Sequence, residues 1–273
     1  MLKKHKQNLH VHTVYCDGKN TPEEMIEAAI AAGFDSLGFS IHSYMSCSIS
    51  GVLSLEKEAD YNIEIERLKA KYKDVFPVYR GVEFDIYSDP SNVDYDYKIA
   101  SVHYLHTRDG VVSFDTRLER ALAYVQNYFD GNSVRFAKAY YEALASAPDY
   151  GKFDIIGHFD LITKNNELQH FIDTDTKQYR SFVCDAVDAL KGKIPFFEVN
   201  TGAMARGYRT SPYPAMDILR LLRENGFGAT ISSDCHFKEY INCGYDLATD
   251  LLREAGYTSK FIFNGKDFEE VAL

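Results

Sequence analysis

Histidines and carboxylates recur at the ends of apolar, strand-like segments of this chain. His10 and His12 stand two residues apart, so in a strand both imidazoles would point to one face and could share a metal ion. An alternating strand with two partly buried histidines would show the same pair. The wider pattern favours a metal site, because side chains of these types also end further segments: His42, Glu83, His103, His158, Asp234 and His236.

Such a set of side chains can bind several divalent cations. Burying an unpaired carboxylate costs several kcal/mol, and a cation removes that cost. Imidazole and carboxylate ligands suit zinc, iron or manganese and do not choose among them. Asp17, in the loop after the histidine pair, offers an oxygen ligand for a second ion. Cys235 lies between Asp234 and His236, so alternation turns its thiol to the opposite face, where we expect a structural role.

Strand-like and helix-like segments alternate from end to end, which is typical of strand and helix units around a parallel sheet. The strand-like segments are residues 8–13, 36–41, 75–83, 97–104, 153–158, 195–200 and 228–233. A sheet closed into a barrel brings the carboxyl ends of its strands to one rim, where residues distant in sequence can share ions. We therefore expect an α/β fold, a distorted (β/α)7 TIM-like barrel that spans residues 1–273 as a single domain.

Helices are expected between these strands. The clearest start has Thr21 as N-cap, Pro22 at the first helical position and Glu24 three residues after the cap, with Gly33 as the stop. Other helices are expected at residues 55–73, 116–147 with a break near Gly131, 176–190, 214–225 and 245–255. The tail, residues 261–273, is expected to form a short strand and a final helical turn on the barrel exterior.

The overall composition narrows the possible partners and location. A net charge of −10 argues against tight non-specific nucleic-acid binding, which depends on lysine and arginine. No run of about 18 apolar residues is present, so we expect a cytoplasmic protein with no membrane partner. The five cysteines are odd in number and scattered, which predicts reduced thiols. The oligomeric state is left open.

Taken in order, the motifs resemble those of the PHP (polymerase and histidinol phosphatase) superfamily, nearest its histidinol-phosphatase branch. They are HVH at His10, CDG at Cys16, SIHS at Ser40, GVE at Gly81, SVH at Ser101, GHFD at Gly157, EVNT at Glu198 and SDCH at Ser233. The set spans almost the whole chain. It departs from the commonest family form at Ile41, because the segment before His42 usually reads Thr-Asp-His and here reads Ser-Ile-His.

The resemblance implies two to three divalent ions (zinc, iron or manganese) at the mouth of the barrel. One ion would bind His10, His12, Glu83 and Asp234. A second would share Glu83 with His103 and His158, and a third would use Asp17, His42 and His236. The resemblance also implies a phosphoric monoester hydrolase acting on a small-molecule phosphate ester, with L-histidinol phosphate and water giving L-histidinol and phosphate.

The reaction is expected to use a hydroxide that bridges metal ions and attacks phosphorus in line. Glu83 and His236 are expected to act in catalysis, together with Asp160 as a candidate acid for the leaving group. Asp160 could instead orient His158. Substrate-binding candidates are Lys164, Arg206 and Arg209 for the phosphate, and Glu198 for the amine. Basic side chains solvated on a rim loop would show the same pattern.

Two other functions are compatible with these residues. The same metal site could serve a PHP-type phosphoesterase acting on nucleotides, oligonucleotide ends or phosphotyrosine protein, although the acidic charge balance disfavours nucleic acid. Alternatively, the chain could be a non-catalytic metal-dependent binding or regulatory protein. The complete set of ligand positions favours an enzyme.

Overall fold

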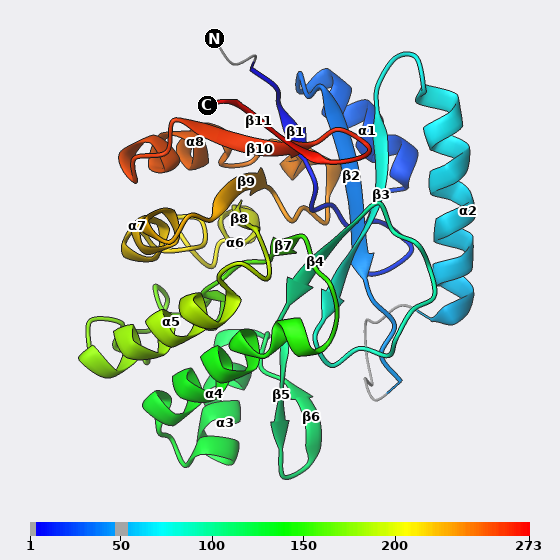
Figure 1. Cartoon of the computed structure of the whole chain (residues 1–273). Coiled ribbons are helices and arrows are strands. Elements are labelled where there is room, and N and C mark those ends of the chain that lie inside the picture. Colours follow the sequence, from blue (N-terminus) through cyan, green and yellow to red (C-terminus); the bar gives the residue numbers. More distant parts are fainter. Residues whose placement is uncertain (1–3, 47–53) are drawn as a thin grey trace.

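Seven parallel strands form the centre of the molecule, in the order β1-β2-β3-β4-β7-β8-β9. The computed structural model describes residues 4–46 and 54–273. The strands are β1 (Gln7–Asn8), β2 (Ser36–His42), β3 (Val78–Asp85), β4 (Tyr97–Ser101), β7 (Ile155–Ile156), β8 (Phe196–Asn200) and β9 (Gly228–Ser232). A parallel bridge from Val11 to Cys235 joins the two edges of the sheet, and the His12 amide donates to the Cys235 carbonyl at 3.0 Å. The sheet is therefore a nearly closed barrel (Figure 1), which confirms the predicted fold class.

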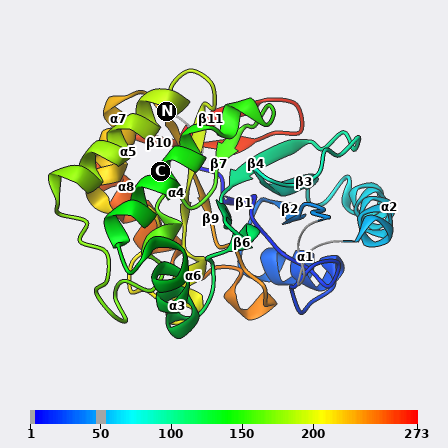
Figure 2. The same cartoon turned by 90° about the horizontal axis from the view of Figure 1, so that it is seen from below.

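Helices surround the barrel. They are α1 (Pro22–Ala31), α2 (Leu55–Tyr72), α3 (Leu118–Phe129), α4 (Ser133–Ala145), α5 (Lys177–Leu190), α6 (Gly202–Ala205), α7 (Met216–Glu224) and α8 (Tyr245–Glu254), with short 3₁₀ turns η1 (Ala147–Asp149), η2 (Leu161–Thr163) and η3 (Lys238–Tyr240). Figure 2 shows the strands at the centre, with α1 and α2 on one side and α3, α4, α5, α7 and α8 on the other. Each helix predicted between the strands is present, and the capping box of Thr21 and Glu24 forms as expected.

The aromatic ring of Tyr97 is packed inside the barrel. Tyr97 is 1% exposed, and its hydroxyl donates to the carbonyls of Leu9 at 2.5 Å and Phe39 at 3.0 Å. Gly38 and Gly81 lie against this ring, because a Cβ atom built on Gly81 would fall 2.3 Å from Tyr97 Cζ. The two glycines therefore make room for an aromatic side chain that joins three strands from inside the barrel.

The C-terminal segment forms a hairpin, so the prediction of a final helical turn on the barrel exterior was wrong. Strands β10 (Ser259–Phe263) and β11 (Phe268–Ala272) pair antiparallel across a turn in which Gly265 has a φ of 99°. The Phe263 ring packs edge-on against Tyr79, and the Phe263 amide and carbonyl both bond to the Gln7 side chain at 2.7 Å. The hairpin thereby covers the amino end of the barrel, at the top of Figure 1.

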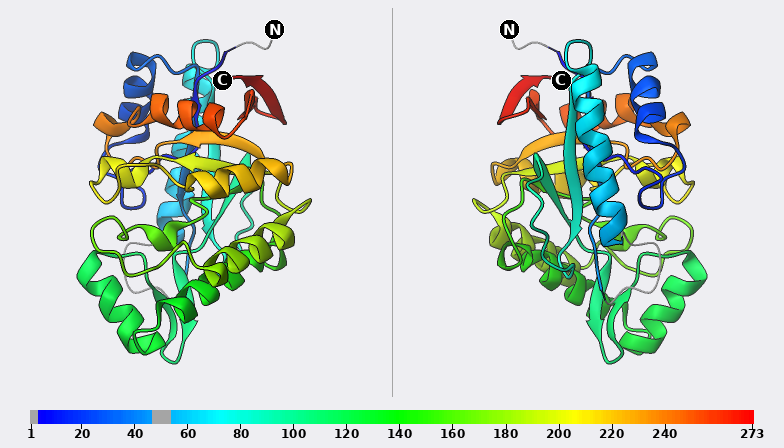
Figure 3. Two further views of the ribbon diagram at one scale, coloured as in Figure 1. Left: turned by 90° about the vertical axis from the view of Figure 1, so that its left-hand side faces the viewer. Right: turned by 90° about the vertical axis from the view of Figure 1, so that its right-hand side faces the viewer.

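A second hairpin lies at the other end of the barrel. Strands β5 (Tyr104–Thr107) and β6 (Gly110–Ser113) are antiparallel and lie at the far end of the molecule from β10 and β11 (Figure 3). The sequence predicted a single strand through Tyr104. The chain instead leaves the barrel after Ser101 and folds back on itself, which brings residues 114–117 close to the ends of the barrel strands.

Two further expectations concern the cysteines and membranes. Cys16, Cys184, Cys235 and Cys243 are free thiols, as predicted, and Cys47 lies outside the described residues. Among the helices of residues 4–46 and 54–273, none combines the length and the hydropathy that a membrane span requires.

Candidate metal centre

All of the predicted ligands gather at the carboxyl-end rim of the barrel. The residues come from most of the strand ends: His10 and His12 follow β1, His42 ends β2, Glu83 lies in β3, His103 follows β4, His158 follows β7, and Asp234 and His236 follow β9. Asp17 reaches the rim from the loop before α1. Because β2 and β3 are paired in register with His42 opposite Glu83, the sheet itself sets the spacing of these two side chains.

Glu83 lies at the middle of this group and is 2% exposed. Its Oε2 atom is 3.2 Å from His10 Nε2 and 3.0 Å from His42 Nδ1. Its Oε1 atom is 3.0 Å from His158 Nε2 and 3.2 Å from His103 Nε2. The two oxygens of one carboxylate therefore face two different sets of imidazoles, which is the arrangement of a ligand shared by two ions.

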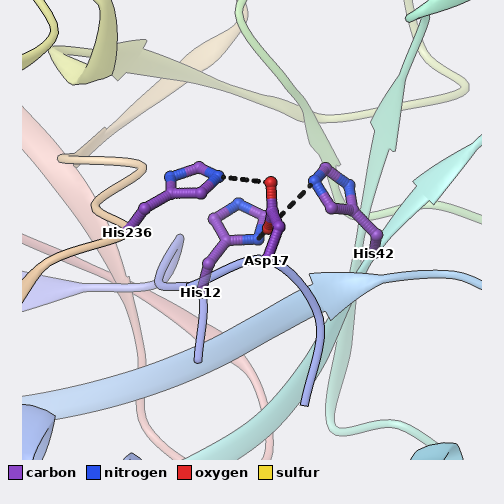
Figure 4. Close-up of side chains that lie close together, drawn as sticks. All are labelled: His12, Asp17, His42 and His236. Carbon is purple, nitrogen blue, oxygen red and sulfur yellow. Dashed lines mark hydrogen bonds and ion pairs between the residues drawn. The ribbon is translucent and has the colours of Figure 1, made fainter. Parts of the chain in front are cut away.

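Asp17 organises a third set of side chains (Figure 4). Its Oδ2 lies 3.1 Å from His236 Nε2, and its Oδ1 lies 3.6 Å from both His42 Nε2 and His12 Nδ1. His12 also stacks on His236, with ring centroids 4.1 Å apart. His12 and His42 thus belong to more than one set, so the geometry allows groupings other than the three that the family resemblance implies. Groups whose ligand atoms lie within 4.8 Å of one another are His12, Asp17, His42 and His236; His10, His12 and Asp234; and His42, Glu83 and His103.

Several of these buried atoms are close to an acceptor without being bonded to it. His12 Nε2 lies 3.1 Å from Asp234 Oδ1, and His10 Nε2 lies 3.2 Å from Glu83 Oε2, yet neither nitrogen has a hydrogen-bond partner among the described residues. Atoms bound to one cation at about 2.1 Å are themselves about 3 Å apart and point at the cation rather than at each other. The donor set therefore fits divalent metal ions.

The carboxylates and imidazoles of the cluster shift one another's pKa values. Burial raises the pKa of Glu83, but His10 and His103 outweigh burial and hold that pKa well below its ordinary value. Burial and the neighbouring His236 lower the pKa of His12 to about 3. Glu83 is therefore ionised and His12 neutral at ordinary pH, and these are the forms in which the two side chains bind metals. Burial lowers the pKa values of His10, His42 and His103, but the neighbouring carboxylates outweigh it and raise them, so a cation bound there would displace protons from these imidazoles.

Glu198 lies behind the cluster, so the expectation that it pairs with the substrate amine does not fit the structure. Glu198 is 1% exposed and its oxygens accept from His10 Nδ1 at 2.9 Å and the His158 amide at 2.9 Å. They also accept from Asn200 Nδ2 at 2.8 Å and Ser232 Oγ at 2.5 Å. The side chain points into the barrel from the middle of β8, where it orients His10 and leaves no oxygen free for a substrate.

Replacing Glu198 by glutamine is expected to weaken metal binding by about 10- to 100-fold, the usual effect of losing a residue that orients a metal-binding histidine. The carboxamide has one acceptor oxygen, so it cannot serve His10, the His158 amide and Ser232 together. Metal affinity measured by competition with a chelator tests this. Thr230→Val, which removes the nearby buried bond to the Phe197 carbonyl, is the control, and equal losses in both variants would contradict the orienting role.

Asp160 and Arg209 also lie too far from the cavity for the roles expected of them, which were leaving-group acid for Asp160 and phosphate binding for Arg209. Asp160 is 1% exposed and accepts from the Ala215 amide at 3.1 Å, and Arg209 lies 3.9 Å from it and stacks over the Tyr213 ring. Neither lines the cavity at the rim. The Nδ1 atom of His158 has no hydrogen-bond partner among the described residues, so Asp160 does not orient that ring. Both residues instead hold the loop behind the site.

A cavity of about 310 Å³ opens over the ligands, at the lower end of the range for small-molecule sites. Lys164 and Arg206 line it, as expected of phosphate-binding residues. Arg206 donates to Asp234 Oδ2 at 3.2 Å and contacts His236 Nδ1 at 3.1 Å. Asp115 and Arg117 also line the cavity, and the sequence analysis did not identify either as a site residue.

Two side chains that position ligands were also missed. Asp85 accepts from the His103 amide at 2.7 Å, and its Oδ2 lies 3.5 Å from His103 Nδ1. The Cys16 thiol lies 3.5 Å from His12 Nδ1. Asp85 could have been found, because it follows Glu83 by two residues in the same strand and alternation puts both on one face. Nothing in the spacing of Cys16 signals its contact.

Comparisons with known proteins agree with this geometry. Residues 8–202 match the model of the PHP domain. A Deinococcus radiodurans protein named "Probable histidinol-phosphatase" is 28% identical over 258 residues, covering 90% of this chain and 92% of that protein. The fold resembles the crystal structure of hisK from Listeria monocytogenes (TM-score 0.75, 21% identity, 89% and 99% of the two chains). It also resembles histidinol phosphate phosphatase from Lactococcus lactis complexed with zinc, L-histidinol and phosphate (TM-score 0.71, 20% identity, 97% and 98%).

The family match covers more than half of the chain and contains most of the residues that meet at the rim. The chain belongs to the PHP domain family.

Proposed function

We propose that this protein is a metal-dependent histidinol-phosphatase, built as a single domain over residues 1–273, that converts L-histidinol phosphate and water to L-histidinol and phosphate. The observation that carries the proposal is the position of Glu83, whose two oxygens face two sets of imidazoles at the floor of a cavity. The relative from Lactococcus lactis, whose fold this chain shares, holds zinc, L-histidinol and phosphate.

Two or three divalent ions would be held by the rim ligands. The donors are imidazole nitrogens and carboxylate oxygens, which suit zinc, iron or manganese. Such ions supply a water of lowered pKa and neutralise charge on the phosphoryl oxygens. Glu83 would hold two of the ions at a fixed separation, and Glu198 would keep the His10 ring turned toward the same point.

The remaining cavity residues would bind the phosphoryl group. Arg206 reaches the rim beside Asp234 and His236, where its guanidinium can meet the oxygens that the ions leave free. Lys164 adds a second positive charge, and its ammonium is held at 2.6 Å by Asp115. These cations attract a dianionic ester locally, although the whole chain carries a net charge of −10.

Turnover of purified, metal-loaded protein tests the proposal. We expect kcat/KM for L-histidinol phosphate to exceed that for nucleoside monophosphates and for a phosphotyrosine peptide by orders of magnitude. Equal or higher activity on nucleotides or on the peptide would replace the proposal with a phosphoesterase of another specificity. Metal binding without hydrolysis of any of these esters would indicate a binding protein.

Removing the metal ions is expected to lower the melting temperature. A ligand that binds only the folded state stabilises it by about 2.7 kcal/mol when present at 100 times its Kd, and for a chain of this size that corresponds to roughly 5–10 °C. Thermal unfolding with and without a chelator measures the change, and re-addition of metal should reverse it. A melting temperature that does not respond to chelation and re-addition would contradict a resident metal centre.

A further inference from the structure

One carboxylate in the cavity lies outside the candidate ligand groups. Among the described residues that line the cavity, the carboxylates are Asp17, Glu83, Asp115 and Asp234. Asp17, Glu83 and Asp234 belong to the clusters that could hold metal ions, and Asp115 does not. Asp115 is therefore the cavity carboxylate that remains available for a part of the substrate other than its phosphate.

The backbone around Asp115 is fixed on both sides. The amide of Phe114 donates to the carbonyl of His103 at 3.1 Å, so the residue next to Asp115 is tied directly to a predicted metal ligand. The Phe114 ring is buried against Phe136. On the other side, Asn165 Nδ2 donates to the Thr116 carbonyl at 3.0 Å. A carboxylate held in this way needs little reorganisation to bind a ligand.

The Asp115 side chain has one oxygen engaged and one available. Lys164 Nζ lies 2.6 Å from Oδ1, and Oδ2 makes no hydrogen bond to a residue within 4–46 or 54–273. The side chain is 24% exposed, and that exposure opens toward the cavity it lines. Burial raises the pKa of Asp115, but Lys164 outweighs burial and holds that pKa below its ordinary value, so Oδ2 is a charged acceptor facing the space that a substrate would occupy.

The proposed substrate carries charges of both signs. Its phosphate is suited to the divalent ions that the rim residues would hold and to Arg206 and Lys164, while its leaving portion carries an ammonium group. An ammonium placed in a cavity without an acceptor would lose its hydration with nothing in exchange. Glu198, the residue that the sequence suggested for this role, is buried beneath His10 with its oxygens already bonded.

We propose that Asp115 binds the ammonium group of the leaving alcohol, so that the cavity selects phosphate esters of amino alcohols. This inference rests on the proposed function, because it assigns the amine end of the same substrate. It makes Asp115 a specificity residue: the carboxylate recognises the leaving portion, while the rim ligands and cations serve the phosphoryl group that every phosphate monoester shares.

Two substrates that differ in one group test the inference. L-Histidinol phosphate and imidazolylpropyl phosphate have the same ring, chain and ester, and only the first has the amine. For the wild-type protein we expect kcat/KM to favour the amine by about 100-fold, a usual contribution of a charged hydrogen bond. In Asp115→Asn the preference should fall to within a few-fold of unity, and Asp115→Glu should restore part of it.

Asp109→Asn is the matched control, because Asp109 is a carboxylate in the turn of the hairpin that precedes Asp115, and it accepts from the Tyr128 hydroxyl outside the cavity. It should keep the full preference. Lys164→Met tests whether Asp115 acts only by holding Lys164. If it does, Asp115→Asn and Lys164→Met will each lower activity on the two substrates in equal proportion, and the inference would be wrong. Equal rates of the wild-type protein on the two esters would also overturn it, without any variant. Hydrolysis of neither ester by the wild-type protein would instead refute the proposed function and remove the basis for the ammonium site.

Discussion

Glu83→Gln is expected to lower kcat/KM for L-histidinol phosphate by about 10²- to 10⁴-fold and to reduce the metal bound per chain. The amide nitrogen cannot bind a cation, so the side chain can serve one of the two imidazole sets but not both. Removing one partner of a buried ionic contact costs about 3–5 kcal/mol, and each 1.36 kcal/mol corresponds to a factor of ten. Steady-state kinetics and elemental analysis of the same preparation measure the two effects together.

Glu58→Gln is the control for that experiment. Glu58 is also a buried glutamate, and it accepts from the hydroxyls of Tyr95 at 2.7 Å and Ser91 at 3.0 Å, away from the metal ligands. An amide oxygen can accept the same bonds, so this variant should keep its metal and its activity. Full activity in Glu83→Gln would show that no shared carboxylate is needed, and the two-ion arrangement would have to be abandoned.

Gly81→Ala is expected to destabilise the protein by about 3 kcal/mol, at the upper end of the usual cost of overpacking a core. The added Cβ would lie 2.3–2.7 Å from three atoms of the Tyr97 ring. The ring cannot withdraw, because its hydroxyl is bonded to the carbonyls of Leu9 and Phe39. Denaturant unfolding measures the loss, and the melting temperature should fall by roughly 6–12 °C.

Gly151→Ala provides the comparison, because the nearest atom to its added Cβ is in the Phe153 ring at an ordinary 3.5 Å. It should change the free energy of unfolding by less than about 0.5–1 kcal/mol. A second test combines Gly81→Ala with Tyr97→Ala. If the clash with the ring is the cause, the two losses will be clearly non-additive, since the smaller side chain leaves room for the new methyl group. Additive losses would exclude this explanation.

The sequence was most informative where the hydrophobic periodicity of a segment and the presence of potential metal-binding side chains gave the same answer. The alternation of apolar runs with amphipathic segments located the barrel strands and the surrounding helices, because each strand must be buried on both faces and each helix on one. The meeting of the candidate ligands could be predicted for a related reason: His42, Glu83 and His158 end such runs, and parallel strands bring their carboxyl ends to the same rim.

Contacts that depend on three-dimensional packing could not be predicted from periodicity and residue type. Glu198 sits in a strand like the ligands, and only the structure shows that its side chain points beneath His10 rather than toward the cavity. Asp160 follows His158 by two residues, but the 3₁₀ turn that begins at Leu161 directs it toward Ala215. Asp115 could not be recognised because its position depends on the β5 and β6 hairpin, which the sequence did not predict.

The turn of the C-terminal hairpin could have been predicted from the sequence. Asn264 and Gly265 form a dipeptide that is typical of hairpin turns, and they lie in the loop of residues 264–267 between β10 and β11, where Gly265 has a φ of 99°. The prediction of the tail did not use this pair and placed a helical turn after the short strand. The burial of Phe263 in the barrel, against Tyr79 and Tyr97, is a tertiary contact that the turn signal alone would not have revealed.

The aromatic filling of the barrel also bears on kinetics. Tyr97 and Phe263 belong to one buried apolar cluster, whereas the candidate ligands line a cavity at the carboxyl-end rim. We expect ester, alcohol and inorganic phosphate to enter and leave by that rim. Phosphate that has not yet left occupies the position needed by the next ester, so product inhibition should be competitive and should set an upper limit on throughput when phosphate is abundant.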